Sequence, residues 1–132
     1  MPSEHKTEID IRYAETDKMG MVHHSAYVVY LEQARVEHLK AIGLPYHKLE
    51  ERGVFLPVIE LKIDYLKPAR FGQKINVVSK IFPVKGARLK VEYSLFCGDE
   101  LILTGYSIHA FIGENKRPIR PARDIIKAIN YA

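Results

Sequence analysis

The sequence contains only one cysteine, Cys97, which excludes an intramolecular disulfide bond. Its longest apolar runs are far too short to cross a lipid bilayer. The first eight residues are polar and lack the apolar run of a secretory signal, so we expect a cytoplasmic protein without a membrane span. Because there is no Gly-flanked aromatic strand motif, helix-turn-helix pattern or Cys/His finger, we expect no nucleic-acid partner.

The chain has 132 residues, of which 47% are apolar and 27% are charged, and this suits a single globular domain over residues 1–132. Its formal net charge is +4. Basic residues are denser in two groups: Lys85, Arg88 and Lys90, and then Lys116, Arg117, Arg120 and Arg123. Two interpretations fit these groups, an ordinary solvated surface or a site for a phosphorylated ligand such as coenzyme A.

Hydrophobic spacing predicts one long helix and an antiparallel sheet. Apolar residues recur at helical spacing from Ser25, which suits an N-cap, to Ile42, and Gly43 ends the helix. Because the sheet is the only large surface that can bury this helix, we expect an α+β fold with one central helix. Strands are predicted at residues 7–13, 55–66, 74–82, 88–97 and 101–112, and short helices are expected at 46–51 and 122–129. The last strand has apolar residues on both faces, so we expect it to be central in the sheet.

Residues 12–27 place an acidic side chain, a glycine turn and two histidines directly before the long helix. Asp17 precedes Gly20, and His23 and His24 follow. A helix N-terminus has free backbone N–H groups that attract a developing negative charge. A carboxylate facing such an oxyanion site is what acyl transfer requires, so Asp17 is a candidate nucleophile or general base. The alternative role for Asp17 is to form the turn itself.

We expect the other reactive side chains to have structural roles and not catalytic or metal-binding ones. Adjacent histidines do not share a helix face, and no matching Cys or acid spacing appears nearby, so we expect no metal site. Cys97 ends an apolar strand face and is expected to be a buried, inert thiol. Glu32 and Arg35 lie three residues apart on the helix, a spacing that favours an ion pair. The remaining candidates, His38 and His109, are expected to serve packing or the surface.

Two segments carry a resemblance to a known family. The first is Tyr13-Ala-Glu-Thr-Asp-Lys-Met-Gly-Met-Val-His-His-Ser-Ala-Tyr27, with Glu32 and Arg35 after it, and the second is Asp64-Tyr-Leu-Lys-Pro-Ala-Arg-Phe-Gly72. The Arg117-Pro118 pair also fits. The chain thereby resembles the hotdog-fold thioesterases of the 4-hydroxybenzoyl-CoA thioesterase family, close to the bacterial acyl-CoA thioesterases associated with the Tol–Pal cluster.

The resemblance implies a hotdog fold, in which a five-stranded antiparallel sheet wraps around one long helix. Two protomers pair into a continuous sheet in this family, as a homodimer or homotetramer, and the active sites lie at their interface. Asp17 matches the family's acidic catalytic residue, and His24 matches the residue whose backbone N–H serves as oxyanion donor. His23 departs from the pattern, because many relatives carry an aromatic residue there.

The resemblance further implies an enzyme that hydrolyses acyl-CoA to a carboxylic acid and coenzyme A. Coenzyme A is then part of the substrate, and no separate cofactor is expected. The family strand that lines the acyl cavity from the partner protomer is central in the sheet and matches Val58, Ile59 and Glu60. The other candidate substrate-binding residues are Tyr13, Gly20, Val22, Tyr27, Lys85, Arg88, Lys90 and Arg117. Two alternatives stay open, a hotdog hydratase or dehydratase acting on an acyl thioester and a non-catalytic acyl-CoA binding module.

Overall fold

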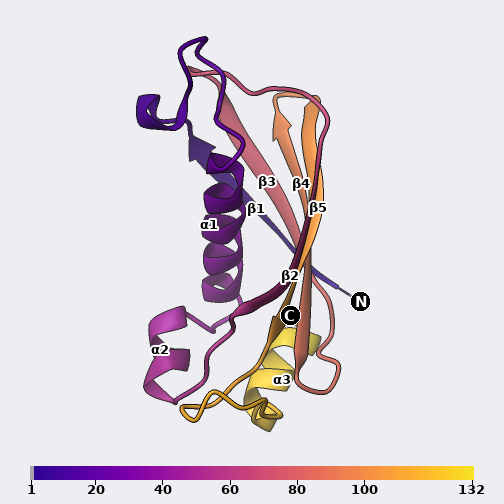
Figure 1. The fold of residues 1–132 in the computed structure, drawn as a ribbon. Coiled ribbons are helices and arrows are strands. Elements are labelled where there is room, and N and C mark those ends of the chain that lie inside the picture. The colour runs from indigo at the N-terminus through magenta and orange to yellow at the C-terminus, as the bar shows by residue number, and fades with distance from the viewer. Residues whose placement is uncertain (1) are drawn as a thin grey trace.

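A computed structural model describes residues 2–132 of the chain and contains one five-stranded antiparallel sheet (Figure 1). Along the chain, the elements are β1 (Ser3–Asp10), the 3-10 helix η1 (Tyr13–Glu15), α1 (Ala26–Ala41), α2 (Tyr46–Glu51), β2 (Val58–Tyr65), β3 (Lys74–Ile81), β4 (Arg88–Cys97), β5 (Glu100–Ala110) and α3 (Arg123–Asn130). The strands lie side by side in the order β1-β3-β4-β5-β2. This architecture confirms the expected hotdog fold.

The long helix α1 lies along one face of the sheet and packs over β1 and β3 (Figure 1). Its buried side chains include Tyr30, Leu31, Ala34 and Leu39, none more than 2% exposed. They meet the inward side chains of the sheet, which alternate with polar outward ones. The alternation is clearest along β4, where the observed strand has the predicted bounds. No described helix is long and apolar enough to cross a membrane.

The strand β5 lies inside the sheet between β4 and β2, which confirms its predicted central position. By contrast, β2 pairs with β5 on one side and is an edge strand within this chain. The expectation of a central position for β2 therefore does not hold in a single protomer. Seven of its eight residues are exposed, so both faces of β2 lack the cover that an interior strand receives.

Two local predictions are wrong. The first strand covers residues 3–10 rather than 7–13, because its inward positions include Ser3 and Thr7, polar residues that are nonetheless buried. The expected ion pair between Glu32 and Arg35 is absent among the described residues. Instead, Glu32 is exposed and Arg35 is only 6% exposed.

Arg35 belongs to a buried chain of hydrogen bonds that joins α1 to the sheet. Its guanidinium donates to the hydroxyls of Tyr46 (3.4 Å) and Tyr93 (3.3 Å). The Tyr93 hydroxyl lies 2.7 Å from Ser107 Oγ, which lies 2.8 Å from His109 Nε2. Burial, followed by the charge of Arg35, lowers the pKa of His109 to about 4. These contacts satisfy polar groups that would otherwise be costly inside the core.

A second buried histidine, His38, links α1 to β1 and β3. Its ring nitrogens lie 2.7 Å from Ser3 Oγ and 2.8 Å from Ser79 Oγ, and its ring stacks on His5. Burial, followed by the charge of His5, lowers the pKa of His38 to about 4. Both fully buried histidines therefore belong to the packed interior, which confirms the packing interpretation for His38 and His109.

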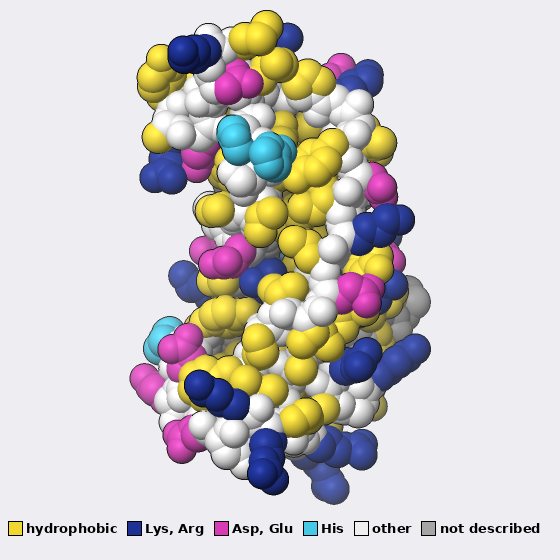
Figure 2. Space-filling view, viewed as in Figure 1, with side chains coloured by type: hydrophobic (Ala, Val, Ile, Leu, Met, Phe, Trp, Pro, Cys, Tyr) yellow, Lys and Arg dark blue, Asp and Glu magenta, His cyan; other side chains and the backbone are white. Residues whose placement is uncertain are grey.

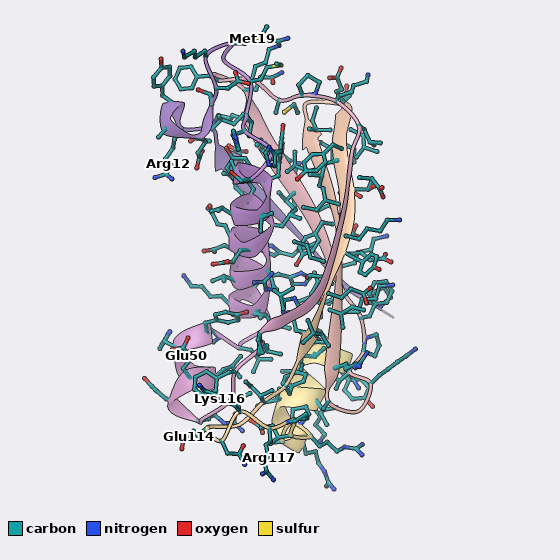
Figure 3. The ribbon with its side chains drawn as sticks, in the orientation of Figure 1. Arg12, Met19, Glu50, Glu114, Lys116 and Arg117 are labelled. Atoms are coloured by element: carbon teal, nitrogen blue, oxygen red, sulfur yellow. The ribbon has the colours of Figure 1, made fainter. Side chains whose placement is uncertain are left out.

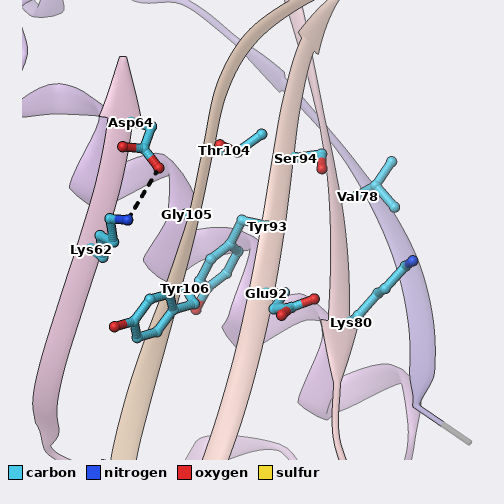
Figure 4. A pocket seen from close by; sticks show the side chains of 10 residues that line it. All are labelled: Lys62, Asp64, Val78, Lys80, Glu92, Tyr93, Ser94, Thr104, Gly105 and Tyr106. Atoms are coloured by element: carbon cyan, nitrogen blue, oxygen red, sulfur yellow. Dashed lines mark ion pairs between the residues drawn. The ribbon is translucent and has the colours of Figure 1, made fainter. Parts of the chain in front are cut away.

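The outer face of the sheet, opposite α1, is polar. A hollow on this face has a volume of about 320 Å³. It is lined by charged, aromatic and small side chains from four strands (Figure 4). Here Lys62 Nζ lies 3.8 Å from Asp64 Oδ2, and both side chains are more than half exposed. Because exposed pairs of this kind contribute little to stability, we regard this hollow as solvated surface.

Candidate active site

The loop between η1 and α1 holds the Asp17 carboxylate at an exposed position. Asp17 Oδ1 accepts hydrogen bonds from the backbone N–H groups of Met19 (2.8 Å) and Met21 (3.1 Å). The backbone closes the same turn, because Asp17 N–H donates to the Met21 carbonyl at 2.8 Å and Gly20 adopts a φ of 76°. The turn therefore fixes one carboxylate oxygen and leaves Oδ2 free of described partners, so the turn role and a chemical role are compatible.

The start of α1 presents a backbone donor. His23 N–H donates to the Glu15 carbonyl, and Ala26 N–H donates to the His23 carbonyl. Between them, His24 N–H has no hydrogen-bond acceptor among the described residues. Ser25 precedes α1 as predicted, but its hydroxyl lies 2.8 Å from His23 Nδ1 and does not cap the helix. A free N–H at the positive end of a helix is suited to bind an oxyanion.

Asp17 and His24 line the same cavity, which has a volume of about 350 Å³. Its walls come from the loop, the first turn of α1 and the segment after β2. Tyr27 is 3% exposed, and its hydroxyl accepts from Ala69 N–H at 3.1 Å. Tyr65 donates from its hydroxyl to the His24 carbonyl at 3.0 Å and packs edge-on against Tyr27. The other lining residues are Met21, Val22, Leu66, Lys67 and Pro68.

The structure separates the predicted substrate-binding residues into two groups. Val22 and Tyr27 line the cavity with Asp17 and His24, and Gly20 lies in the Asp17 turn. Tyr13 is nearby in η1, 76% exposed and edge-on to Phe71. We call the second set the far-end group: Val58, Ile59, Glu60, Lys85, Arg88, Lys90 and Arg117. Figure 3 shows this separation through its labels, with Met19 of the Asp17 loop at one end of the molecule and Arg117 at the other.

Strand register explains the separation. Tyr65, at the end of β2, contacts His24, whereas Val58 starts the strand seven residues earlier. At about 3.3 Å per residue, these two ends of β2 are roughly 23 Å apart. Val58 pairs with His109 and Arg88 pairs with Ala110, so the basic residues of β4 lie at the same end as Val58. Within one chain, the far-end group therefore lies away from Asp17.

An apolar trough connects the two ends. It runs between α1 and β2, and Figure 2 shows hydrophobic side chains gathered there. Val28 of α1 is 38% exposed, and Leu61 and Tyr65 of β2 are 41% and 50% exposed. Because α1 packs over β1 and β3, it leaves the inward side of β2 uncovered. The trough is an apolar surface that this chain does not itself bury.

Three contributors to the site were missed by sequence reasoning. Tyr65 orients the first turn of α1, and Glu15 and Tyr30 tie the Asp17 loop to α1 through a 2.7 Å hydrogen bond. Glu15 lies inside the motif that drew attention to Asp17, so its position was the available signal. The contacts of Tyr65 and Tyr30 join segments 41 and 15 residues apart, and no local pattern indicates them.

Potential metal ligands do not cluster among the described residues, and the thiol of Cys97 is buried. Among residues 2–132, no group of three or more His, Cys, Asp or Glu side chains is arranged to hold a metal ion. His23 and His24 stack with ring centroids 4.3 Å apart. Cys97 is buried, and burial, followed by the charge of Glu100, raises the pKa of its thiol, which makes it a weak nucleophile.

Comparisons with known proteins show the family to which this chain belongs. A family model described as the Thioesterase-like superfamily matches residues 11–129. The chain is 35% identical over 117 residues to a Bacillus subtilis protein named "Putative acyl-CoA thioesterase YneP", covering 87% of this chain and 85% of that protein. It is therefore a member of the Thioesterase-like superfamily, a thioester hydrolase with the hotdog fold.

Two solved structures show how close the fold is. A hypothetical protein, TT1821 from Thermus thermophilus, is 43% identical with a TM-score of 0.89, and the match covers 96% of this chain and 95% of that one. A DHNA-CoA thioesterase from Staphylococcus aureus is 34% identical with a TM-score of 0.84, and the match covers 89% of this chain and 80% of that one. Both matches cover most of this chain, so they share its fold as a whole.

Proposed function

We propose that this chain hydrolyses acyl-CoA to a free carboxylic acid and coenzyme A. One observation carries the proposal: Asp17, whose side chain is exposed, and His24, whose N–H has no acceptor among the described residues, line the same cavity at the start of α1. The names of two relatives, an acyl-CoA thioesterase and a DHNA-CoA thioesterase, support a coenzyme A thioester as the substrate. We also propose that the chain is close to the 4-hydroxybenzoyl-CoA thioesterase family, needs no cofactor and acts in the cytoplasm.

In the proposed reaction, the thioester carbonyl oxygen accepts a hydrogen bond from His24 N–H. The helix N-terminus then stabilises the negative charge that this oxygen gains as the carbonyl carbon becomes tetrahedral. Asp17 acts in one of two ways. Its carboxylate attacks the carbonyl carbon and forms a mixed anhydride that water cleaves, or it takes a proton from the water that attacks. In both routes the C–S bond breaks and coenzyme A leaves as a thiolate, which gains a proton.

The edge of β2 supports a homodimer. Its outer edge has no strand partner among the described residues, and the trough beside it exposes apolar side chains. An unpaired, partly apolar edge is a template for a second strand. A twofold axis through β2 would pair the strand antiparallel with its own copy, which is the usual symmetry of a homodimer. Dimers could pair again into a homotetramer.

This pairing would bring the far-end group of the partner to the Asp17 cavity. Because the copies of β2 would run in opposite directions, Val58 of the partner would lie opposite Tyr65. Val58, Ile59 and Glu60 of the partner would then wall the acyl cavity. The basic residues of the far-end group would lie at its mouth, where Lys85, Arg88, Lys90 and Arg117 could contact the phosphates of coenzyme A.

The test is thiol release from a panel of acyl-CoA substrates by the wild-type protein and by Asp17→Asn. We expect wild-type hydrolysis, and a loss of roughly 10²- to 10⁴-fold in kcat for the variant, because the amide can neither attack nor accept the proton. Thermal unfolding and circular dichroism of the variant check that it is folded. A folded Asp17→Asn with full activity would refute the role of Asp17, and a wild type that releases no thiol would refute the activity.

A further inference from the structure

A cluster of hydrogen bonds around Glu15 joins the Asp17 loop to α1. Glu15 Oε1 accepts from the Tyr30 hydroxyl at 2.7 Å and from the Arg12 backbone N–H at 2.8 Å. Glu15 Oε2 accepts from Arg12 Nε at 3.1 Å. Tyr30 is 1% exposed, and the Glu15 side chain is 12% exposed. The carboxylate is thus held from two elements, the start of η1 and the second turn of α1.

The backbone of Glu15 reaches the other half of the site. Its carbonyl accepts from His23 N–H at 2.8 Å, directly before His24, which lines the cavity and whose N–H has no acceptor among the described residues. Glu15 itself lies two residues before Asp17. A bridge between Thr16 and Val22 closes the loop between these points. One residue therefore connects the Asp17 turn to the start of α1 through both its side chain and its main chain.

The contribution of the Glu15 cluster to the free energy of unfolding does not by itself explain why the cluster is present. Burial opposes the ionised form of Glu15, but hydrogen bonds from Arg12 and Tyr30 outweigh it and lower the pKa of Glu15. The Arg12 side chain is 75% exposed, and an ion pair with such an exposed partner contributes little to the free energy of unfolding. The cluster does restrict orientation, because three donors hold one carboxylate in place. Catalytic groups need this restriction, since a displacement of about 1 Å can cost 10²-fold in rate.

We propose that Glu15 is a positioning residue, anchored to α1 by Tyr30, that sets the placement of the Asp17 carboxylate relative to the His24 N–H. The proposal rests on the proposed thioesterase function, because that function makes these two groups work on one carbonyl. Glu15 and Tyr30 touch neither the reacting atoms nor the acyl group. They act through the loop, so their effect falls on turnover and not on substrate binding.

The experiment compares Glu15→Gln, Tyr30→Phe and the double variant in steady-state hydrolysis of the best acyl-CoA substrate. Glu15→Gln places an amide N–H₂ where a donor already points, and Tyr30→Phe removes the anchor without a change of shape. We expect kcat to fall by about 10- to 100-fold in each, with KM within about twofold of wild type. The kcat of the double variant is expected to be no lower than that of the less active single variant, because both substitutions disrupt the same Tyr30–Glu15 hydrogen bond.

Two controls separate the possible outcomes. Glu37→Gln makes the same chemical change at an exposed position of α1 and should keep the wild-type kcat. A merely structural role for Glu15 would lower the melting temperature while kcat per folded protein stays unchanged, and this result would overturn the proposal. Asp17→Asn, measured in parallel, reports on the proposed function by itself. If wild type is active and Asp17→Asn is not, normal kcat in Glu15→Gln refutes only the positioning role; an inactive wild type refutes both proposals.

Discussion

His24 presents two different groups near the cavity. Its imidazole stacks on His23, and its backbone N–H has no described acceptor. Tyr65 holds the carbonyl of the same residue through a 3.0 Å hydrogen bond, so the peptide plane on its C-terminal side is anchored while its N–H stays available. A role for the N–H and a role for the ring lead to opposite expectations for substitution.

We therefore predict that His24→Ala keeps most of the wild-type kcat, because alanine retains the backbone N–H. His24→Pro removes this donor two residues before α1, where the N–H makes no hydrogen bond among the described residues, and should lower kcat by about 10²- to 10³-fold. Thiol release measures both effects, and circular dichroism reports the content of α1. A large loss in His24→Ala with full activity in His24→Pro would assign the chemistry to the imidazole.

The sequence predicts the positions of some of these residues and not of others. The closeness of Asp17 to His24 was predictable, because the loop between them is short and leads directly into the start of α1. Arg35 was not, because its partner Tyr93 is 58 residues away and its burial depends on the packing of α1 against the sheet. Helical spacing to Glu32 suggested an exposed ion pair, and only the fold shows that the guanidinium points inward.

At the scale of elements, the contact between β5 and β2 depends on a glycine. A Cβ at Gly105 would clash with the Lys62 carbonyl oxygen, a backbone atom that cannot move without the strand. We predict that Gly105→Ala lowers the free energy of unfolding by about 1–3 kcal/mol, because β2 must shift to avoid the clash. Urea denaturation measures this change.

Thr104→Ala is the matched control for this prediction, since it changes the neighbouring residue, which lines the polar outer face. It should alter the free energy of unfolding by less than about 0.5 kcal/mol. Equal stability of Gly105→Ala and wild type would mean that β2 does not approach β5 as closely as the structure shows.

A strand was predicted accurately where its buried face is apolar, and less accurately where polar residues are buried. The bounds of β4 were predictable because its inward residues are uniformly apolar, and β5 was recognisable as central by its apolar residues on both faces. The start of β1 was missed because Ser3 and His5 meet His38 through polar contacts. The position of the far-end group was not predictable, since register and strand order decide which end of β2 each residue occupies.

Considered as a whole, the molecule should lose stability in acid through its two buried histidines. His38 faces Ser3, Ser79 and His5, and His109 faces Ser107, the Leu56 carbonyl and Arg35. Each has a pKa of about 4 in the folded protein, against about 6.5 when unfolded.

Between these two values the unfolded chain binds more protons than the folded one, so the free energy of unfolding falls as the pH falls from about 6.5 to 4. The expected slope is at most about 1.4 kcal/mol per pH unit for each histidine. Urea midpoints across this range, compared between wild type and His109→Gln, measure the effect. The variant should lose about half of the slope from the pair, and an unchanged slope would show that His109 does not contribute.

The outer edge of β2, which has no strand partner among the described residues, has a genetic consequence. In the proposed dimer, each site takes Asp17 from one protomer and the far-end group from the other. A mixed dimer of an Asp17-defective chain and a chain defective in the far-end group has both lesions in one site and neither in the second. Two alleles that are each inactive alone would then complement each other within one gene product, with half of the sites in every mixed dimer restored.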